Sequence, residues 1–411
     1  MLKNYLKLSV KILGRRKFFT FVSLFGIGFT LLVLTLAAAM LDHIFSSYPP
    51  ETKGDRTLVL DNVRMQGKDS MSTGPGGYAL YDRYMRGIPG VERLSILSQP
   101  ETVISYWKGT RLKSLIKRTD ADFFRILDFE WIEGGPFGEA DVSEARFVAV
   151  INETTRTKFF AGASALGRDI EADGQTFKVV GVVPDVPIFR LMATGDIYVP
   201  LTTAKTDDYK TRLRGGFLAL FLLKDREAVE GVQQEFKARL KKVDLPEGFD
   251  RIYAVPETFF GSFARLFIGD FESEDAGSRL MAILLTAAAL FMILPAVNLV
   301  NLNVSRALER ASEIGVRRAF GASARDLLLQ FLFENVVISV VGGLLALVSA
   351  ALVLALLNRS DLIPYAHFTL NWRIAAWGFG FALAFGVISG VWPAWRLSRL
   401  TPIEALAGGV K

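Results

Sequence analysis

Four long apolar stretches constrain this chain more than any other feature of its sequence. A helix needs about 20 apolar residues to cross the hydrocarbon core of a bilayer. Membrane-spanning helices are therefore expected over residues 18–41, 280–304, 327–357 and 374–395. The third stretch is longer than a bilayer requires, so it either tilts or starts in the cytosol. The polar residues 42–279 between the first two spans are numerous enough for a large folded domain.

The composition agrees with this division. The chain has 411 residues, of which 51% are hydrophobic and 22% charged, and its formal net charge is +6. A chain that is both this apolar and this charged has to separate lipid-facing from water-facing parts. It contains no cysteine, so disulfide and thiolate chemistry are excluded, although this absence does not define a compartment.

The distribution of lysine and arginine predicts the orientation, because short cytoplasmic flanks carry the excess of positive charge. Basic residues gather in residues 1–17, 305–326 and 396–411. We expect these three segments in the cytoplasm, as an N-terminal basic segment, a loop between the second and third spans, and a tail. The domain over 42–279 and the short loop 358–373 are then outside the cytoplasm, which means the periplasm if the chain spans the inner membrane of a bacterium with two membranes.

The first span has a second interpretation. A basic start, an apolar run and Ala37 to Ala39 also resemble a cleaved signal peptide. However, a signal core has roughly 7–15 apolar residues, and this stretch has about 24. A retained membrane anchor is therefore favoured.

The segment between the first two spans alternates strand-like and helical patterns. Runs rich in β-branched and aromatic residues predict strands at 57–60, 147–151, 177–183, 197–201 and 217–223. Apolar spacing of three and four predicts helices, among them 152–160 and 226–242. Asp173-Gly174 predicts a hairpin turn. The expected fold is an α+β domain, in which the glycine-rich residues 62–77 form a mobile exposed loop.

No catalytic arrangement is recognisable. His43 and His367 belong to no metal-spaced cluster and are expected to be interfacial. The motifs G-x-S-x-G, H-E-x-x-H and G-x-x-x-x-G-K-[ST] are absent, and GPGG follows no strand directly, so it does not predict a phosphate site. Carboxylates that lie close together in the sequence are expected to be solvated loop charges, such as Asp120 with Asp122, and Glu272 with Glu274 and Asp275. We therefore expect neither an enzyme nor a metal site.

The cytoplasmic segment ERASEIGVRRAFGASARD begins at Glu309. Its polar helix pattern ends at Gly321, a natural C-terminal stop. Ser323 and Asp326 then have the capping-box spacing before an apolar run. From the residues alone, two interpretations stay open: a basic loop that anchors lipid headgroups, and a docking surface for a cytosolic partner.

The span before this segment has polar features of its own. Pro295 lies in its interior and can kink the helix. Asn298, Asn301 and Asn303 follow, and such amides can hydrogen-bond between helices or lie at the interface.

The segment 309–322 resembles the pattern E-R-x-x-E-I-G-[IV]-R-[RK]-A-[LF]-G-A of MacB/FtsX-type ABC transporter permeases. The C-terminal WPAWRLSRLTPIEALAGG resembles the end of the same family, with Leu397 or Ser398 where a small residue is usual. Residues 147–185 resemble the family's periplasmic core domain.

This resemblance implies a four-helix permease that acts as a dimer with a cytosolic ABC ATPase dimer. Residues 305–326 would form the coupling segment that docks on this ATPase. Its ATPase-coupling residues would be Glu309, Arg310, Glu313, Ile314, Gly315, Arg317, Arg318, Phe320 and Gly321. Because the chain has no P-loop, we expect the ATPase in another polypeptide, which would bind the ATP and magnesium. No cofactor is expected in this chain.

Few ionisable groups lie in the spans, which argues against a polar path through the membrane. Glu334 is the main exception; it either pairs with a nearby arginine at the cytosolic face or reaches water below the bilayer. The second permease would be the same chain or a paralogue. Membrane lipids, a periplasmic adaptor and an outer-membrane channel are further candidate partners; nucleic acid is not.

The expected function is export of a peptide, macrolide-like compound or other amphipathic cargo by mechanotransmission. The alternatives are a lipoprotein-releasing permease of the LolC/LolE kind, an FtsX-like regulator of a cell-wall hydrolase, and a membrane-anchored sensor or scaffold without an ATPase. A domain of about 240 residues is larger than the regulator's role usually needs.

Overall fold

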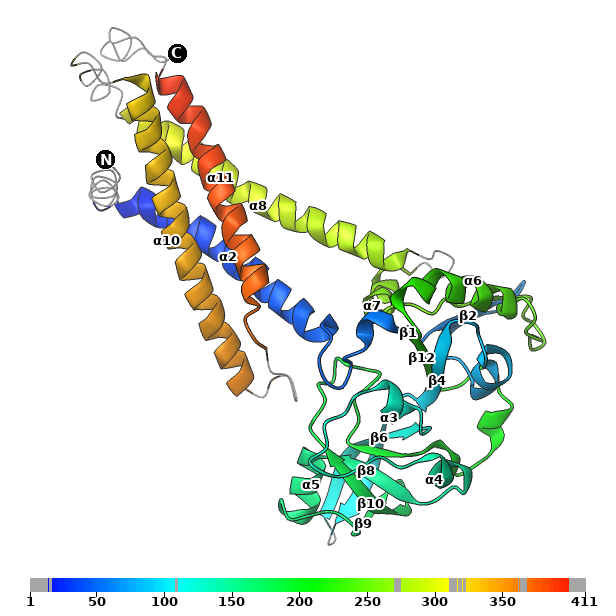
Figure 1. The fold of residues 1–411 in the computed structure, drawn as a ribbon. Helices are drawn as coiled ribbons and strands as arrows, with labels where there is room; N and C mark the ends of the chain where they lie inside the picture. The colour runs from blue at the N-terminus through cyan, green and yellow to red at the C-terminus, as the bar shows by residue number, and fades with distance from the viewer. Residues whose placement is uncertain are drawn as a thin grey trace. The chain divides into compact units, whose positions relative to one another are not determined.

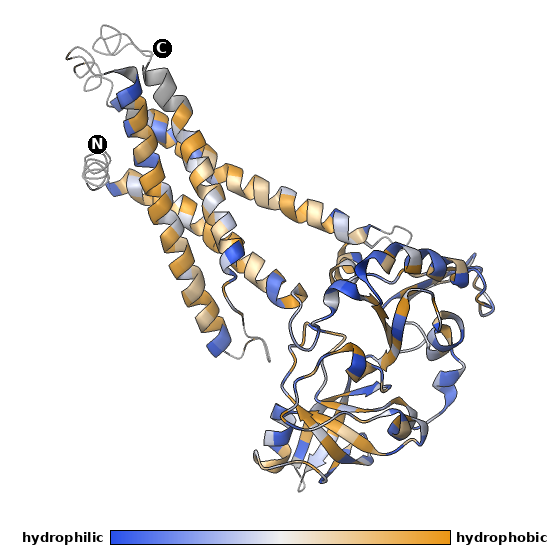
Figure 2. Ribbon diagram, viewed as in Figure 1, coloured by the Kyte–Doolittle hydropathy of each residue, from blue (hydrophilic) through white to orange (hydrophobic). Residues whose placement is uncertain are grey.

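The computed structural model describes residues 14, 17–107, 110–269, 275–309, 316, 320, 323–360, 362 and 368–398. The chain forms two compact units. The helical unit contains the apolar helices, and the outer domain consists mainly of Ile44–Ala282. Figure 2 shows their contrast in hydropathy: the long helices are largely apolar, whereas the outer domain mixes polar and apolar residues.

Four helices are long and apolar enough to cross a membrane, as the sequence predicted (Figure 1). They are α2 (Lys17–Phe45), α8 (Ala276–Glu309), α10 (Ala324–Arg359) and α11 (Trp372–Ser398). The apolar core of the helical unit is formed by Ile27, Leu31, Leu299, Ile338, Ala346 and Ala382. The predicted fold class, four membrane helices with a large α+β domain, is confirmed.

Small residues allow α10 and α11 to approach closely. A Cβ added to Gly386 would lie 2.0 Å from the Ser339 Oγ, and one added to Gly390 would lie 2.4 Å from the Asn335 Nδ2. Glycines four residues apart on one helix face are typical of close helix packing in membranes. The sequence GVISG at 386–390 therefore gives α11 a face on which α10 can pack closely.

The three asparagines of α8 have different environments. The Asn303 Nδ2 donates to the Ser389 carbonyl of α11 at 3.4 Å, so its predicted role between helices is confirmed. Asn298 and Asn301 are exposed on the surface of α8.

The outer domain is built on a ten-stranded mixed sheet with the order β1-β12-β4-β6-β11-β8-β10-β9-β5, and β7 pairs with β10. Strand β5 also pairs with β6, so the strands from β6 to β5 close into a ring and β4, β12 and β1 extend from it. The strands are β1 (Thr57–Leu60), β4 (Val91–Ser98), β5 (Glu101–Trp107), β6 (Thr110–Thr119), β7 (Glu133–Gly134), β8 (Val148–Asn152), β9 (Asp169–Ala172), β10 (Gln175–Val183), β11 (Ile197–Pro200) and β12 (Phe217–Leu223).

Short helices cover this sheet. Helix α5 packs beside β8 (Figure 1), and α6 buries Val232, Phe236 and Leu240 in the core of the domain. The helices are α3 (Phe123–Ile126), α4 (Glu139–Ser143), α5 (Glu153–Phe160), α6 (Val229–Leu240) and α7 (Phe259–Ile268). Single turns are η1 (Gly54–Arg56), η2 (Leu80–Met85), η3 (Leu201–Thr203), η4 (Asp208–Lys210) and η5 (Arg226–Ala228).

The predicted hairpin at Asp173-Gly174 is confirmed as the turn between β9 and β10. Asp173 and Gly174 have φ values of 54° and 69°, the left-handed conformation that a two-residue hairpin turn requires at both positions. The predicted helix over 152–160 is also confirmed, and the Asn152 side chain caps it by accepting a hydrogen bond from the Thr155 amide at 2.8 Å.

The prediction of a mobile loop over 62–77 is wrong. Strands β2 (Val63–Gln66) and β3 (Met71–Gly74) form a three-stranded sheet with β13 (Arg251–Tyr253). Val63 and Met65 alternate with polar residues and are buried in the domain core. An apolar alternation of only two residues among many glycines is too short to be recognised as a strand.

Candidate functional site

The predicted coupling segment lies mainly outside the described residues. This applies to Arg310, Glu313, Ile314, Gly315, Arg317, Arg318 and Gly321. Of the two coupling residues that the structure does describe, Glu309 ends α8 and Phe320 exposes 88% of its surface. An exposed phenylalanine beside basic residues has the chemistry of a contact surface, since aromatic side chains supply much of the binding energy at interfaces.

The predicted helix cap after this segment is present. The Ser323 Oγ accepts a hydrogen bond from the Asp326 amide at 3.2 Å, and the Asp326 Oδ2 accepts one from the Ser323 amide at 3.3 Å. This reciprocal pair satisfies backbone donors that would otherwise be free at the start of α10. The cap therefore fixes where the long helix begins.

Glu334 is buried in the helical unit on α10. The Gln330 Nε2 donates a hydrogen bond to the Glu334 Oε1 at 3.1 Å. Its burial argues against the interpretation in which this carboxylate simply reaches water.

The outer domain contains a second candidate site, at the chain that leaves α2. We call residues 46–56 the exit segment. Arg190 lies against it and is itself buried. Its Nη1 lies 2.7 Å from the Glu51 Oε2, its Nη2 donates to the Ser46 carbonyl at 2.9 Å, and its guanidinium lies 3.6 Å from the centre of the Tyr48 ring. One arginine thus holds three residues of the exit segment.

Lys117 of β6 supports this contact from inside the domain. It is fully buried, and its Nζ donates to the Leu191 and Met192 carbonyls at 2.7 Å each. Burial lowers the pKa of Lys117 to about 7, opposed by the attraction of Glu51. Burial likewise raises the pKa of Glu51 to about 7, opposed by Arg190 and Lys117. Burying these charges costs free energy, but their contacts fix the position of the exit segment.

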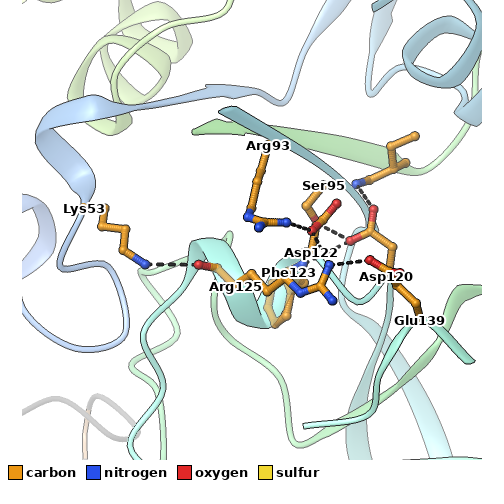
Figure 3. A network of polar contacts seen from close by, with 9 residues as sticks. Lys53, Arg93, Ser95, Asp120, Asp122, Phe123, Arg125 and Glu139 are labelled. Carbon is orange, nitrogen blue, oxygen red and sulfur yellow. Dashed lines mark hydrogen bonds and ion pairs between the residues drawn. The ribbon is translucent and has the colours of Figure 1, made fainter. Parts of the chain in front are cut away.

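A further contact ties the exit segment to α3, as Figure 3 shows. The Lys53 Nζ donates to the Arg125 carbonyl at 3.0 Å and pairs with the Asp128 carboxylate at 2.7 Å. Asp122 in turn pairs with Arg93 of β4 at 2.8 Å and with Arg125 at 3.1 Å. Helix α3 therefore connects the exit segment to the large sheet.

Asp120 and Asp122 were expected to be solvated. For Asp120 this expectation is wrong, whereas the Asp122 side chain, although ion-paired, keeps 27% of its surface exposed. The Asp120 carboxylate accepts hydrogen bonds from the Ser95 Oγ at 2.7 Å, the Ile96 amide at 2.8 Å and the Phe123 amide at 3.1 Å (Figure 3). Burial raises the pKa of Asp120 to about 6 although these bonds oppose the rise. Both carboxylates join the turn after β6 to β4 and to α3, Asp120 through hydrogen bonds and Asp122 through ion pairs.

The chain that leads into α8 is held in a similar way. We call residues 257–269, which contain α7, the entry segment. The Arg265 Nη2 and Nε each lie 2.7 Å from an oxygen of Glu257, and both side chains are buried. Burial raises the pKa of Glu257, opposed by Arg265. Such a two-point contact fixes direction as well as distance.

The two segments meet at β1. The Phe45 ring lies 5.1 Å from the Phe260 ring and 5.0 Å from the Phe263 ring. Val59 of β1 and Glu257 exchange backbone hydrogen bonds of 2.7 and 2.9 Å. We call the exit segment, the entry segment and β1 together the membrane junction. Sequence reasoning missed it because Glu51 and Arg190 are 139 residues apart, and such a pairing leaves no local pattern.

Among the residues that the structure describes, no group of three or more His, Asp or Glu side chains is arranged to hold a metal ion. His43 is buried and lies 4.8 Å from the Phe368 ring, while His367 lies outside the described residues.

Comparison with known families finds two matches along the chain. Residues 20–239 match the MacB-like periplasmic core domain, and residues 285–402 match the FtsX-like permease C-terminal region. The chain belongs to the MacB/FtsX-type family of ABC transporter permeases. The outer domain is thus a MacB-like periplasmic core domain, and the protein is an inner-membrane protein.

Individual relatives in this family have moderate identity to the chain. The macrolide export ATP-binding/permease protein MacB of Bdellovibrio bacteriovorus is 29% identical over 67% of this chain and 41% of its own length. The pyoverdine export ATP-binding/permease protein PvdT of Pseudomonas syringae is 31% identical over 71% and 42%. The ABC transporter permease YknZ of Bacillus subtilis is 23% identical over 78% and 77%. The chain thus spans less than half the length of the two relatives that are also named for ATP binding.

Proposed function

We propose that this chain is the permease subunit of a MacB-like ABC transporter, and that it transmits the work of a separate ATPase to the outer domain. The observation that carries this proposal is the membrane junction. The described parts of both connections, residues 46–56 and 257–269, are held by buried arginine–glutamate pairs and converge on β1. Removing one partner of a buried pair costs about 3–5 kcal/mol, so these connections can bear load.

The ATPase would dock on the coupling segment. Three observations support this: its family-specific pattern, the exposed Phe320, and the capped start of α10 directly after it. A capped helix start resists fraying, so a push on the segment is passed into α10. Both chain termini would lie on the same cytoplasmic side.

A second permease subunit would cover α8. Asn298 and Asn301 are exposed on this apolar helix, and an amide that faces hydrocarbon lacks partners for its hydrogen bonds. A second helix at this face could supply them. The partner would be either a second copy of the chain or a paralogue.

The names of two relatives support a proposal for the class of cargo. MacB and PvdT are named for export of a macrolide and a pyoverdine, so an amphipathic compound or peptide released on the periplasmic side is the first choice. An adaptor and an outer-membrane channel would complete such an exporter. A LolC/LolE-type permease has the same topology, whereas the size of the outer domain argues against an FtsX-like regulator.

Charge reversal in the coupling segment tests the proposal. Arg317→Glu with Arg318→Glu should abolish permease-stimulated ATP hydrolysis by the copurified ATPase while the protein still inserts into the membrane. Arg359→Glu, at the opposite end of α10, is the matched control and should leave hydrolysis unchanged. Normal stimulation in the double variant would contradict ATPase docking and favour the lipid-anchoring interpretation of this segment.

A further inference from the structure

One loop of the outer domain exposes apolar side chains and buries its charged one. In residues 186–195, the three exposed side chains are Ile188, Phe189 and Leu191, with exposed fractions of 41%, 44% and 51%. The single charged residue among them, Arg190, is only 2% exposed. A loop in water normally does the opposite, keeping charge outside and large apolar groups inside. We call residues 186–195 the apolar loop.

Hydrogen bonds hold the backbone of the apolar loop in place. The Arg190 amide donates to the Pro187 carbonyl, and the Ala193 and Thr194 amides donate to the Arg190 carbonyl, at 2.8–2.9 Å. From the interior of the domain, the Lys117 Nζ donates hydrogen bonds to the carbonyls of Leu191 and Met192. Two buried basic side chains, Lys117 and Arg190, thus hold the backbone of a loop that exposes three apolar side chains.

The level of the apolar loop relative to the bilayer can be inferred from where α2 ends. Arg190 donates to the carbonyl of Ser46, the first residue after α2. Helix α2 has 29 residues and is therefore about 44 Å long. A bilayer with its headgroups is about 40–45 Å thick, so a spanning α2 brings Phe45 to the level of the outer headgroups. Arg190 of the apolar loop is hydrogen-bonded directly to Ser46, the residue after Phe45.

We propose that the apolar loop contacts the lipid of the outer leaflet, with Ile188, Phe189 and Leu191 reaching between the headgroups. Apolar and aromatic side chains are favourable at this depth, and the loop exposes no charge that would have to be desolvated. Because Arg190 belongs to both the loop and the exit-segment contact, lipid binding would hold the membrane junction at the bilayer surface. The inference needs α2 to span the membrane but does not depend on the ATPase or the cargo.

Site-specific fluorescence tests this contact in the full-length protein. The chain has no cysteine, so Phe189→Cys gives a single attachment point for an environment-sensitive fluorophore. The labelled protein is reconstituted in phosphatidylcholine vesicles with or without brominated acyl chains. We expect a blue-shifted emission and at least twofold quenching by the brominated lipid.

Met71→Cys is the matched control, because Met71 is also a large exposed apolar residue, with 67% exposure, but lies on β3 of the small sheet. It should show no quenching. Ile188→Cys and Leu191→Cys repeat the test at neighbouring positions, so that one label turning away cannot decide the result. Quenching at all three loop positions no stronger than at Met71 would overturn the proposal. So would shielding of the loop by an added protein without quenching by lipid, because the loop would then be a protein-docking surface.

Discussion

Arg190 and Arg265 lie far apart in the sequence, yet each forms a buried ion pair with a glutamate at 2.7 Å next to a membrane helix. A buried ion pair adds little net stability compared with apolar residues of the same size, but breaking it by removing one partner is costly. These two arginines are therefore better explained by the fixed geometry that they impose than by the stability that they add.

Arg265→Met should strongly destabilise the entry segment. The substitution leaves the Glu257 carboxylate buried without its two-point partner, which costs about 3–5 kcal/mol. Hydrogen exchange of α7 and β1 in the full-length protein should accelerate accordingly. The double variant Glu257→Leu/Arg265→Met removes both charges and should recover most of the protection. Exchange equal to wild type in the single variant would contradict the claim that this pair fixes the entry segment.

Asp120 makes the stability of the outer domain depend on pH. Burial raises its pKa to about 6 from an ordinary value near 3.8. The folded state therefore binds the proton more tightly, and this contribution to stability is present below about pH 4 and lost as the pH rises through 6. Asn cannot ionise, so Asp120→Asn should gain stability relative to wild type between pH 4 and 6, with no further gain above about pH 7. Urea unfolding followed by tryptophan fluorescence measures this difference, and a constant difference across the range would contradict the assignment.

At the scale of elements, α10 begins where the coupling segment ends. Ser323→Ala removes the helix cap and should cost about 1 kcal/mol at the first turn. We expect faster hydrogen exchange of the first amides of α10 and weaker stimulation of the ATPase. Ser323→Asp should restore both, because aspartate caps a helix as well as serine does. Unchanged exchange in the alanine variant would show that the cap does not set the start of this helix.

The elements that the sequence predicted correctly are those with a strong local signal. The apolar spans, the strand over 217–223 and the Asp173-Gly174 hairpin each depend on residues within a short window. Strands β2 and β3 were missed because each has four residues among glycines. Of the candidate site, the capping box was predictable from its spacing, whereas the membrane junction was not. Its contacts join residues such as Glu51 and Arg190, which only the closed tertiary fold brings together.

At the scale of the whole molecule, the chain joins a membrane unit to a periplasmic core domain through two connections that end on one strand. Most domain linkers are exposed and flexible, whereas the exit segment and the entry segment are held by buried charges, aromatic contacts and backbone hydrogen bonds. This construction suits a permease that passes motion from the membrane helices to the outer domain. A passive anchor would not need it.

The central claim is that motion enters the outer domain through the membrane junction. Pulsed electron–electron double resonance between spin labels at Met71→Cys on two permease copies, in nanodiscs with the ATPase, measures this motion directly. We predict a distance change on adding ATP in the otherwise wild-type protein. In Arg190→Met/Arg265→Met the change should disappear while ATP hydrolysis and the hydrogen-exchange protection of β8 and β10 persist. A distance change of the same size in the double variant would contradict the account.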